Sequence, residues 1–478
     1  MKSGHKMINP QSLQRKSFPP FPLSDTKENA QFDNVMLNTV NLLKGRKNIV
    51  VVVGAGISTS AGIPDFRSKG GIYDEVNNSL DYNELGLSTP EELFHMEIFQ
   101  EDPRPFYSFA KSSLYASSPD FTPSHKFLAL LDKMQMLRRI YTQNIDGLEV
   151  KAGISPNKVV YAHGSLSTST CLRCKNKVDT DSIRNEILSG NVPTCKARLS
   201  KKRKKQDNDS DSIGLICHGV MKPNITFFGE KLNDKVRRCL ESDRSKADAL
   251  IVIGTSLSVS PMNKVIQYLR PSIPRILINR NIVIPKNMTI DDDSLNDANE
   301  KDHRTGYIFD AILLGFCDEI TRAFAYIMQN QQDETRNEKL HSNLNNESTS
   351  KTERAIKPAS GKTSARLLPF HSDECVLLSE TKLENLDQKS LHNHPVERII
   401  LFPGAKLDVP VDNEDTIYHE VVNCDGCHKV IKGDIMRCTT CFDFDLCSMC
   451  HSKLSKTHFD GSHKFLVEKQ SKSVDSKL

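Results

Sequence analysis

Ten of the thirteen cysteines fall into two groups whose spacing suits metal binding. The groups are Cys171, Cys174, Cys195 and Cys217, and then Cys424, Cys427, Cys438, Cys441, Cys447 and Cys450. Repeated C-x-x-C pairs in a chain without an export signal are more typical of metal sites than of disulfide bonds. Four thiolates in the first group predict a closed tetrahedral zinc site, and closed sites are structural.

The second group continues with His458 and His463, which brings it to eight ligands, enough for two four-coordinate zinc ions. A module this short cannot build a sufficient core without metal. The strings Cys424-Asp-Gly-Cys427 and Cys441-Phe-Asp-Phe-Asp-Leu-Cys447 resemble the ZZ-type zinc finger, a cross-braced fold. The resemblance implies that the first and third cysteine pairs share one zinc, and that the middle pair and the two histidines bind the other.

The ZZ resemblance also implies a ligand pocket. Asp425, Asp443 and Asp445 match the acids with which ZZ domains hold a protein N-terminus or a basic tail, and carboxylates near an ammonium group are a sound basis for that. His428 stands where relatives often carry an amide, so the preferred ligand stays open. A purely structural finger with solvated acids is the alternative.

A glycine-rich turn follows the first expected strand of the chain. Asn48–Val53 is an uninterrupted β-branched run, which predicts a buried strand, and Gly54-Ala-Gly56 comes directly after it. Such a turn lets backbone N–H groups approach a diphosphate at a helix start. A dehydrogenase would also need an acid about 20 residues later for the ribose, which is hard to place here, so hydride transfer is disfavoured.

The longer string Gly54-Ala-Gly-x-Ser…Gly-Ile-Pro-Asp-Phe-Arg67 resembles the signature of the sirtuins, the NAD-dependent protein deacylases. Five further motifs of that family follow in order: Thr142-Gln-Asn-Ile-Asp146, Ala162-His-Gly164, Lys222–Glu230, Gly254-Thr-Ser256 and Asn279-Arg280. The resemblance covers about residues 32–330. It implies an α/β fold, a Rossmann-like parallel sheet with a small zinc-binding module.

The resemblance implies a role for each motif. His163 is the general base, since an unperturbed pKa of ~6.5 suits proton removal at neutral pH, and Asn144 and Asp146 complete the catalytic group. Thr226, Phe228 and Gly229 pair the backbone of the substrate peptide by strand addition. The residues implied to bind NAD are Ala55, Gly56, Ile57, Ser58, Thr59, Asp65, Phe66, Arg67, Gln143, Asn144, Ile145, Asp146, Gly254, Thr255, Ser256, Asn279, Arg280, Asn281 and Cys317. For Cys317, a buried small apolar residue is an equal alternative.

The implied reaction transfers the acetyl group of a protein lysine to NAD-derived ADP-ribose, which gives nicotinamide and 2′-O-acetyl-ADP-ribose. Relatives that remove acidic acyl groups carry Tyr-x-x-Arg after the Asp-Phe-Arg motif, whereas Tyr73 is followed here by Asp74 and Glu75. We therefore expect a preference for acetyl. A mono-ADP-ribosyltransferase and a non-catalytic NAD-sensing scaffold are the rival interpretations.

The zinc module of the sheet domain departs from the sirtuin pattern. Sirtuins usually keep the second zinc pair a few residues apart, whereas 21 residues separate Cys195 from Cys217. Residues 199–212, with the basic run Lys201–Lys205, are interpreted as a loop inserted into the second knuckle. Whether Cys195 is a ligand stays open.

Composition divides the chain into segments. We expect a disordered tail at 1–31, the sirtuin-like domain at 32–330 with its zinc module at about 166–222, a disordered linker at 331–417 rich in polar residues, the ZZ finger at 418–467 and a tail at 468–478. Within the domain, Arg138–Tyr141, Ala249–Ile253 and Arg275–Ile278 are expected strands, and Ser124–Met136 an expected helix.

Charge and terminal motifs limit the partners and the location. Lys plus Arg is 64 and Asp plus Glu is 60, a balance of +4, so we expect no direct binding of nucleic acid beyond a local patch. No run of 18 apolar residues predicts a membrane span. The expected partners are an acetylated protein such as a histone tail and, at the finger, a protein N-terminus or basic tail. The expected location is nucleus and cytoplasm, and Ser476-Lys477-Leu478 makes the peroxisome the alternative.

Overall fold

The computed structural model describes residues 27–65, 71–72, 87, 89–199, 215–230, 234–258, 262–283, 308–347, 376–377, 399–402, 405, 424–427, 431, 433–441 and 444–468. These residues form three sheets, of which the largest has eight strands in the order β10-β11-β9-β8-β7-β1-β2-β3. All neighbouring strands in it are parallel except β10 and β11. The strands are β1 Ile49–Val53, β2 Leu137–Thr142, β3 Val159–Tyr161, β7 Ala249–Ile253, β8 Arg275–Asn279, β9 Ala311–Leu314, β10 Val376–Leu377 and β11 Ile399–Leu401.

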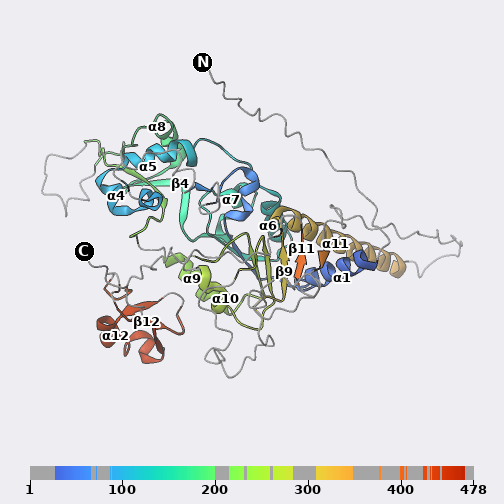
Figure 1. Ribbon diagram of the computed structural model, residues 1–478. Helices are drawn as coiled ribbons and strands as arrows, with labels where there is room; N and C mark the ends of the chain where they lie inside the picture. The colour runs from blue at the N-terminus through green and yellow to red at the C-terminus, as the bar shows by residue number, and fades with distance from the viewer. Residues whose placement is uncertain are drawn as a thin grey trace, which may run out of the picture.

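Helices cover both faces of this sheet, which confirms the predicted Rossmann-like architecture (Figure 1). Strand β1 is wholly buried, and its alternate residues enter two different cores. Ile49, Val51 and Val53 pack with α1, α6 and α11, whereas Val50 and Val52 pack with α9 and α10. The helices are α1 Lys27–Asn41, α6 Pro123–Lys133, α7 Leu148–Lys151, α9 Asp234–Arg244, α10 Val265–Tyr268 and α11 Cys317–Glu347. Among the described residues, no helix has the length and apolar character needed to cross a membrane.

Part of residues 331–417, which the sequence indicates to be a linker, contributes to this sheet. Helix α11 continues past residue 330 to Glu347, and β11 pairs in parallel with β9. The physical reason is the apolar run Ile399-Ile-Leu-Phe402, in which Ile399 and Ile400 are fully buried. A short apolar cluster can therefore complete a sheet even inside a polar segment.

A second, smaller module holds the first cysteine group. Its antiparallel sheet has the order β5-β4-β6 and packs with an aromatic core that includes Phe94, Phe99, Phe106 and Phe227. Its elements are β4 Gly164–Cys171, β5 Lys177–Asp179, β6 Met221–Ile225, α4 Met96–Glu101, α5 Arg104–Phe109, the π-helix Ala110–Leu114 and α8 Arg184–Leu188.

The C-terminal module is built on a third sheet with the order β13-β12-β14, and helix α12 follows β13 along the chain. Its elements are β12 Ile435–Cys438, β13 Asp445–Cys447, α12 Ser448–Leu454 and β14 Phe465–Glu468. Its core is small, with Cys424, Ile431, Ile435 and Leu446 buried. So small a core agrees with the expectation that metal supplies the remaining stability.

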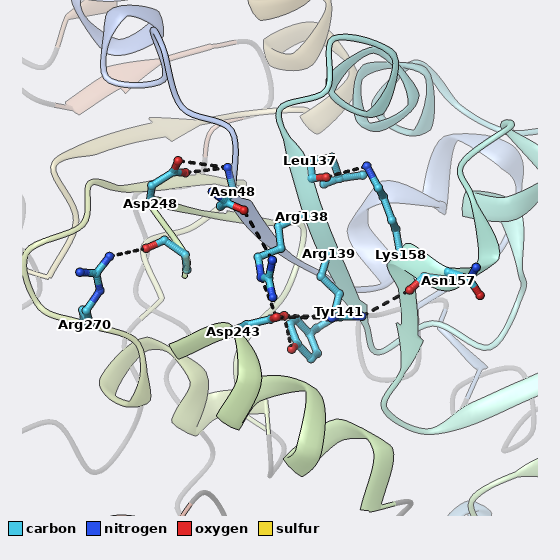
Figure 2. Close-up of polar contacts among 11 residues, drawn as sticks. Asn48, Leu137, Arg138, Arg139, Tyr141, Asn157, Lys158, Asp243, Asp248 and Arg270 are labelled. Atoms are coloured by element: carbon cyan, nitrogen blue, oxygen red, sulfur yellow. Dashed lines mark hydrogen bonds and ion pairs between the residues drawn. The ribbon is translucent and has the colours of Figure 1, made fainter. Parts of the chain in front are cut away.

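One buried carboxylate fastens α9 to β2. Asp243 of α9 is fully buried and accepts hydrogen bonds from Arg138 Nε at 2.7 Å, Arg139 Nε at 2.6 Å and Tyr141 Oη at 2.7 Å. Figure 2 shows these three side chains of β2 turned toward Asp243. Close by, Asp248 accepts the backbone N–H of Asn48 at 3.0 Å and so ties the start of β1 to β7. The strands that lead into the site are thereby held at their base.

Candidate active site

The site lies where the chain reverses its direction across the parallel sheet. From β1 the chain proceeds through β2 and β3 on one side, and β7, β8 and β9 extend the sheet on the other side. In open parallel sheets, ligands bind beyond the carboxyl ends of the strands at such a switch point. The loops that follow β1, β2 and β7 meet there, and they carry three of the sequence motifs singled out above.

Two glycines bring the first and third of these loops into backbone contact. Gly56, in the 3-10 turn Ala55–Ile57, donates its N–H to Gly254 O at 2.8 Å. A Cβ at Gly56 would lie 2.7 Å from Gly254 Cα, and Gly254 has φ of +60°. Only glycine permits this approach. The resulting turn presents backbone N–H groups at the carboxyl end of β1, as a diphosphate requires.

The loop after β2 is fastened to both of these loops by its polar side chains. Gln143 Nε2 donates to Thr255 Oγ1 at 2.7 Å, and Asn144 Nδ2 donates to Gly54 O at 3.1 Å and to Ser58 Oγ at 3.2 Å. Ser58 Oγ in turn donates to Asp146 Oδ2 at 2.8 Å. The structure therefore brings together residues that lie about 90 positions apart in the sequence, as the numbering of Ser58 and Asp146 shows.

His163 stands beside this loop with a defined tautomer. Its Nδ1 lies 3.1 Å from the carbonyl oxygen of Gln143, which can only accept, so Nδ1 carries the proton. Nε2 then has the lone pair that a general base needs. The backbone carbonyl of His163 accepts the N–H of Thr226 at 2.8 Å, so the backbone of His163 is also tied to the predicted substrate strand.

The predicted peptide-binding strand follows β6. Phe228 forms a bridge with His95, and its own backbone N–H and C=O bond to Phe94 O and Met96 N. These backbone groups of Phe228 are bonded within the chain, and its side chain is exposed. Gly229 has φ of +85°, which ends the strand. Strand addition by Thr226, Phe228 and Gly229 stays a prediction.

The predicted adenosine side is formed by the ends of β7 and β8. Asn279 Nδ2 donates to Thr255 O at 3.2 Å and to Asn281 O at 3.0 Å, and Arg280 lies over the ring of Phe316. Cys317 is buried at the start of α11, and burial raises the pKa of its thiol to about 12. It is therefore a neutral thiol at physiological pH. Phe66 and Arg67, predicted for the nicotinamide side, lie outside the described residues.

The first cysteine group has the geometry of a zinc site. All four sulfur atoms lie within 4.8 Å of one another and are buried, with Cys171 to Cys217 at 3.7 Å and Cys174 to Cys195 at 3.6 Å. In a tetrahedron with Zn–S bonds of ~2.3 Å, neighbouring sulfurs lie about 3.8 Å apart. Four buried thiols at this spacing fit zinc, and Cys195 belongs to the group.

Antiparallel backbone pairing of the segments that contain Cys195 and Cys217 explains how these two residues meet despite the residues between them. Thr194 pairs with Val220 and Arg198 with Ile216, both antiparallel. Cys217 N–H donates to Ala197 O at 2.9 Å within this pairing. The residues that flank the insertion are thus paired with each other, and residues 200–214 lie outside the described residues.

The C-terminal module divides its ligands as the ZZ resemblance implied. Cys424, Cys427, Cys447 and Cys450 form one group, and Cys438, Cys441, His458 and His463 form the other. In the second group, Cys441 Sγ lies 3.4 Å from His458 Nε2 and 3.3 Å from His463 Nδ1. Both sets of donors fit zinc.

Two of the three predicted pocket acids are joined to each other by two hydrogen bonds. Asp425 N–H donates to Asp445 O, and Asp445 N–H donates to Asp425 Oδ2, both at 2.8 Å. The Asp445 carboxylate is bound by Arg437 at 2.9 Å and lies 3.9 Å from Lys264 Nζ of the sheet domain. Asp443 lies outside the described residues.

Comparison with known proteins identifies both modules. Residues 54–261 match the Sir2 family, and residues 418–464 match the zinc finger of ZZ type. Over residues 54–261 the chain is similar to the Sir2 family. It is 42% identical over 263 residues to "NAD-dependent histone deacetylase sir2" of Schizosaccharomyces pombe, which covers 52% of this chain and 54% of that protein.

Two other relatives show the same relationship. "NAD-dependent deacetylase sir2D" of Dictyostelium discoideum is 40% identical over 281 residues, 59% of this chain and 44% of that protein. "NAD-dependent protein deacetylase sirtuin-1" of Rattus norvegicus is 42% identical over 249 residues, 52% of this chain and 41% of that protein. The chain therefore spans about half the length of the curated relatives that it matches.

The Sir2 domain also contains two site residues that sequence reasoning missed. His125 of α6 and Glu149 of α7 are fully buried. A ring nitrogen of His125 and a carboxyl oxygen of Glu149 each lie within 4.8 Å of a carboxylate oxygen of Asp146. The available signal was the spacing of Asp146 and Glu149, since residues three apart in a helical turn face the same side. His125 is the N3 residue of the capping box that begins α6, and the sequence analysis did not single it out.

Proposed function

We propose that the chain is an NAD-dependent protein-lysine deacetylase. The observation that carries the proposal is the orientation of His163: its Nδ1–H bonds to the Gln143 carbonyl in the loop after β2, and the same loop carries Asn144 and Asp146, which are fixed by Ser58 at the switch point of the sheet. Such a site offers a general base and oriented polar groups, and the described part of it places no activated nucleophilic side chain there. The transfer of an acyl group between two substrates needs this arrangement.

The loops around the site fit NAD. Backbone N–H groups of the Gly54–Ser58 turn suit the diphosphate, and the close contact of Gly56 with Gly254 leaves no Cβ in the way. Thr255 and Asn279 are held by each other at the end of β7 and β8, where the adenosine half would lie. NAD supplies an electrophilic ribose carbon with nicotinamide as the leaving group. This chain's residues hold the ribose, exclude water and accept a proton.

The proton acceptor in this proposal is His163 Nε2. When Nε2 accepts a proton from the substrate, the ring becomes an imidazolium, and the Gln143 carbonyl that accepts Nδ1–H stabilises this charge. Asn144 and Asp146 hold the ribose hydroxyls and a water through the Ser58 chain. The acetyl-lysine peptide lies along residues 226–229, whose start is hydrogen-bonded to His163.

The test is the stoichiometry of the reaction on an acetylated histone peptide. A deacetylase releases one nicotinamide for each acetyl group lost, an ADP-ribosyltransferase labels protein without loss of acetyl, and a scaffold does neither. His163→Ala should lower turnover about 10²-fold or more and leave NAD binding largely intact. Near-normal turnover of this variant would refute the role of His163.

For the ZZ finger, we propose that it holds an N-terminus or basic tail of the substrate protein. The support is the acidic group around Asp425 and Asp445, and an ammonium, Lys264 Nζ, already lies 3.9 Å from Asp445. A ligand ammonium would exchange with Lys264. Deletion of residues 418–478 should then raise KM for an intact acetylated protein, because a tethered finger raises the local substrate concentration, but not for a short internal peptide. Equal KM values on both substrates would exclude this role.

The proposed location is nucleus and cytoplasm, in line with an acetylated histone as substrate. Ser476-Lys477-Leu478, which lies outside the described residues, makes the peroxisome the alternative address. Imaging of the tagged chain with and without these three residues distinguishes the two.

A further inference from the structure

Beside the proposed NAD site lies a closed group of three titratable side chains from three elements. Glu149 of α7 and His125 of α6 are each 0% exposed, and Asp146 belongs to the loop between β2 and α7. A ring nitrogen of His125 and one carboxyl oxygen from each of the two acids all lie within 4.8 Å of one another. Among the described residues, His125 Nε2 and both carboxyl oxygens of Glu149 have no hydrogen bond of standard geometry.

The hydrogen bonds decide which of the two carboxyl groups carries the negative charge. Asp146 Oδ2 accepts from Ser58 Oγ at 2.8 Å, and Asp146 Oδ1 accepts from Leu148 N at 2.9 Å. Donors that point at a carboxylate stabilise its charged form, whereas burial without donors disfavours it. Two carboxylates this close, one of them fully buried, cannot both ionise without a large penalty. Asp146 is thus the anion.

We propose that Glu149 is a neutral carboxylic acid that positions Asp146, and that the site works only while Glu149 keeps its proton. This inference rests on the proposed function only for its activity readout. A second negative charge on Glu149 would repel the Asp146 carboxylate. Asp146 orients Ser58, and Ser58 accepts from Asn144, so the disturbance would reach the ribose-holding side chains directly.

The titratable groups that face Glu149 within the described part of the chain supply no compensating cation. Burial lowers the pKa of His125, although the charges of Asp146 and Asp318 oppose this, so His125 is neutral. Burial raises the pKa of Tyr161 from β3, and the Glu149 charge adds to that rise. Burial, with the Asp146 charge, raises the pKa of Glu149 to about 8, against a smaller lowering by the Thr142 hydroxyl.

The raised pKa of Glu149 makes the stability of the fold depend on pH. The folded-state pKa lies above the ordinary value of 4.5, so the unfolded chain releases a proton that the native state retains. The stability contributed by the neutral acid is complete below about pH 4.5 and is lost as the pH rises through about 8. Activity should fall over the alkaline end of the same range, because the disturbed Asp146 no longer orients its partners.

The experiment compares the wild type with Glu149→Gln, which keeps the shape of the neutral acid but cannot ionise. Above a pH of about 8, kcat/KM for NAD of the wild type should fall by about tenfold per pH unit, as one ionisation requires. In Glu149→Gln this alkaline decline should be absent. Glu101→Gln at the exposed end of α4 is the matched control and should keep the decline. An unchanged decline in Glu149→Gln would overturn the proposal.

Two measurements do not depend on activity. The infrared carbonyl band of a protonated carboxylic acid should be present in the wild type at neutral pH and disappear at a pH well above 8. Its absence at neutral pH would overturn the proposal even if the variant fails to fold. The Tm difference between Glu149→Gln and wild type should grow from acid to alkaline pH. If the chain has no deacetylase activity, the proposed function fails, while the infrared band still decides the state of Glu149.

Discussion

The contact between Gly56 and Gly254 gives a sharp way to test the proposed NAD site, through Gly56→Ala. The φ angle of Gly56 is not in the left-handed region, so alanine introduces no backbone strain there. Its only direct effect is a Cβ that would lie 2.7 Å from Gly254 Cα, 2.9 Å from Gly254 O and 3.1 Å from Gly254 C. All three atoms are backbone, so no side chain can rotate away.

The magnitude follows from the overlap. Carbon atoms make favourable contact at about 3.5 Å or more, so the loops after β1 and β7 must separate by roughly 0.8 Å. Overpacking of this kind costs about 1 to 3 kcal/mol. If that cost falls on the geometry that binds NAD, affinity falls by about 5- to 150-fold, since each 1.4 kcal/mol is a factor of about ten. The proposed acetyl-peptide site, on residues 226–229, is not touched.

The assay is KM for NAD at saturating acetyl-peptide, together with calorimetric titration of NAD. Gly45→Ala is the control, because Gly45 has φ of +76° but no atom lies within 4 Å of the place that an alanine Cβ would take. That variant should lose about 1 to 2 kcal/mol of stability through strain and keep its KM for NAD. An NAD KM for Gly56→Ala within about twofold of wild type would refute the reasoning, since a misplacement of about 1 Å should matter more.

Three further predictions concern the metal, the core and the acyl group. Cys195→Ser should lower the bound zinc by one ion per chain, measured by mass spectrometry of the purified protein. Asp243→Asn should cost about 3 to 5 kcal/mol in the free energy of unfolding because Arg138 and Arg139 lose a buried partner, whereas Asp248→Asn should cost about 1 kcal/mol or less. Acetyl peptide should be turned over faster than the matched succinyl peptide, and the reverse order would contradict the interpretation of Tyr73-Asp-Glu75.

Much of the sheet could be predicted because its strands are buried on both faces. Ile49–Val53, Ala249–Ile253 and Arg275–Asn279 are nearly continuous β-branched or aliphatic runs, and such runs are typical of parallel strands under two helical layers. Strand β11 was missed for a different reason. Its three residues Ile399–Leu401 stand within a long polar segment, and only pairing with β9 makes them a strand.

The site was predictable where a motif names its residues and less so where geometry assigns them. Spacing could suggest that Asp146 and Ser58 serve one site, but not that a hydrogen bond joins them. The tautomer of His163 depends on a carbonyl 20 residues away. Glu149 gave almost no signal, because a glutamate in a short helix is usually solvated, and only its complete burial shows otherwise.

The contacts among the three loops explain why the site is preorganised. Gln143 donates a hydrogen bond to the loop after β7, and Asn144 donates one to the loop after β1. Asp146 accepts a hydrogen bond from Ser58, which also belongs to the loop after β1. Because β2 is fastened to α9 through Asp243, the loop that carries these side chains also has a rigid base. Polar groups held in this way need little reorganisation when charge develops, which is the condition under which they stabilise a transition state best. A neutral acid at Glu149 serves the same preorganisation, since it leaves a single charge, on Asp146, to orient the other side chains.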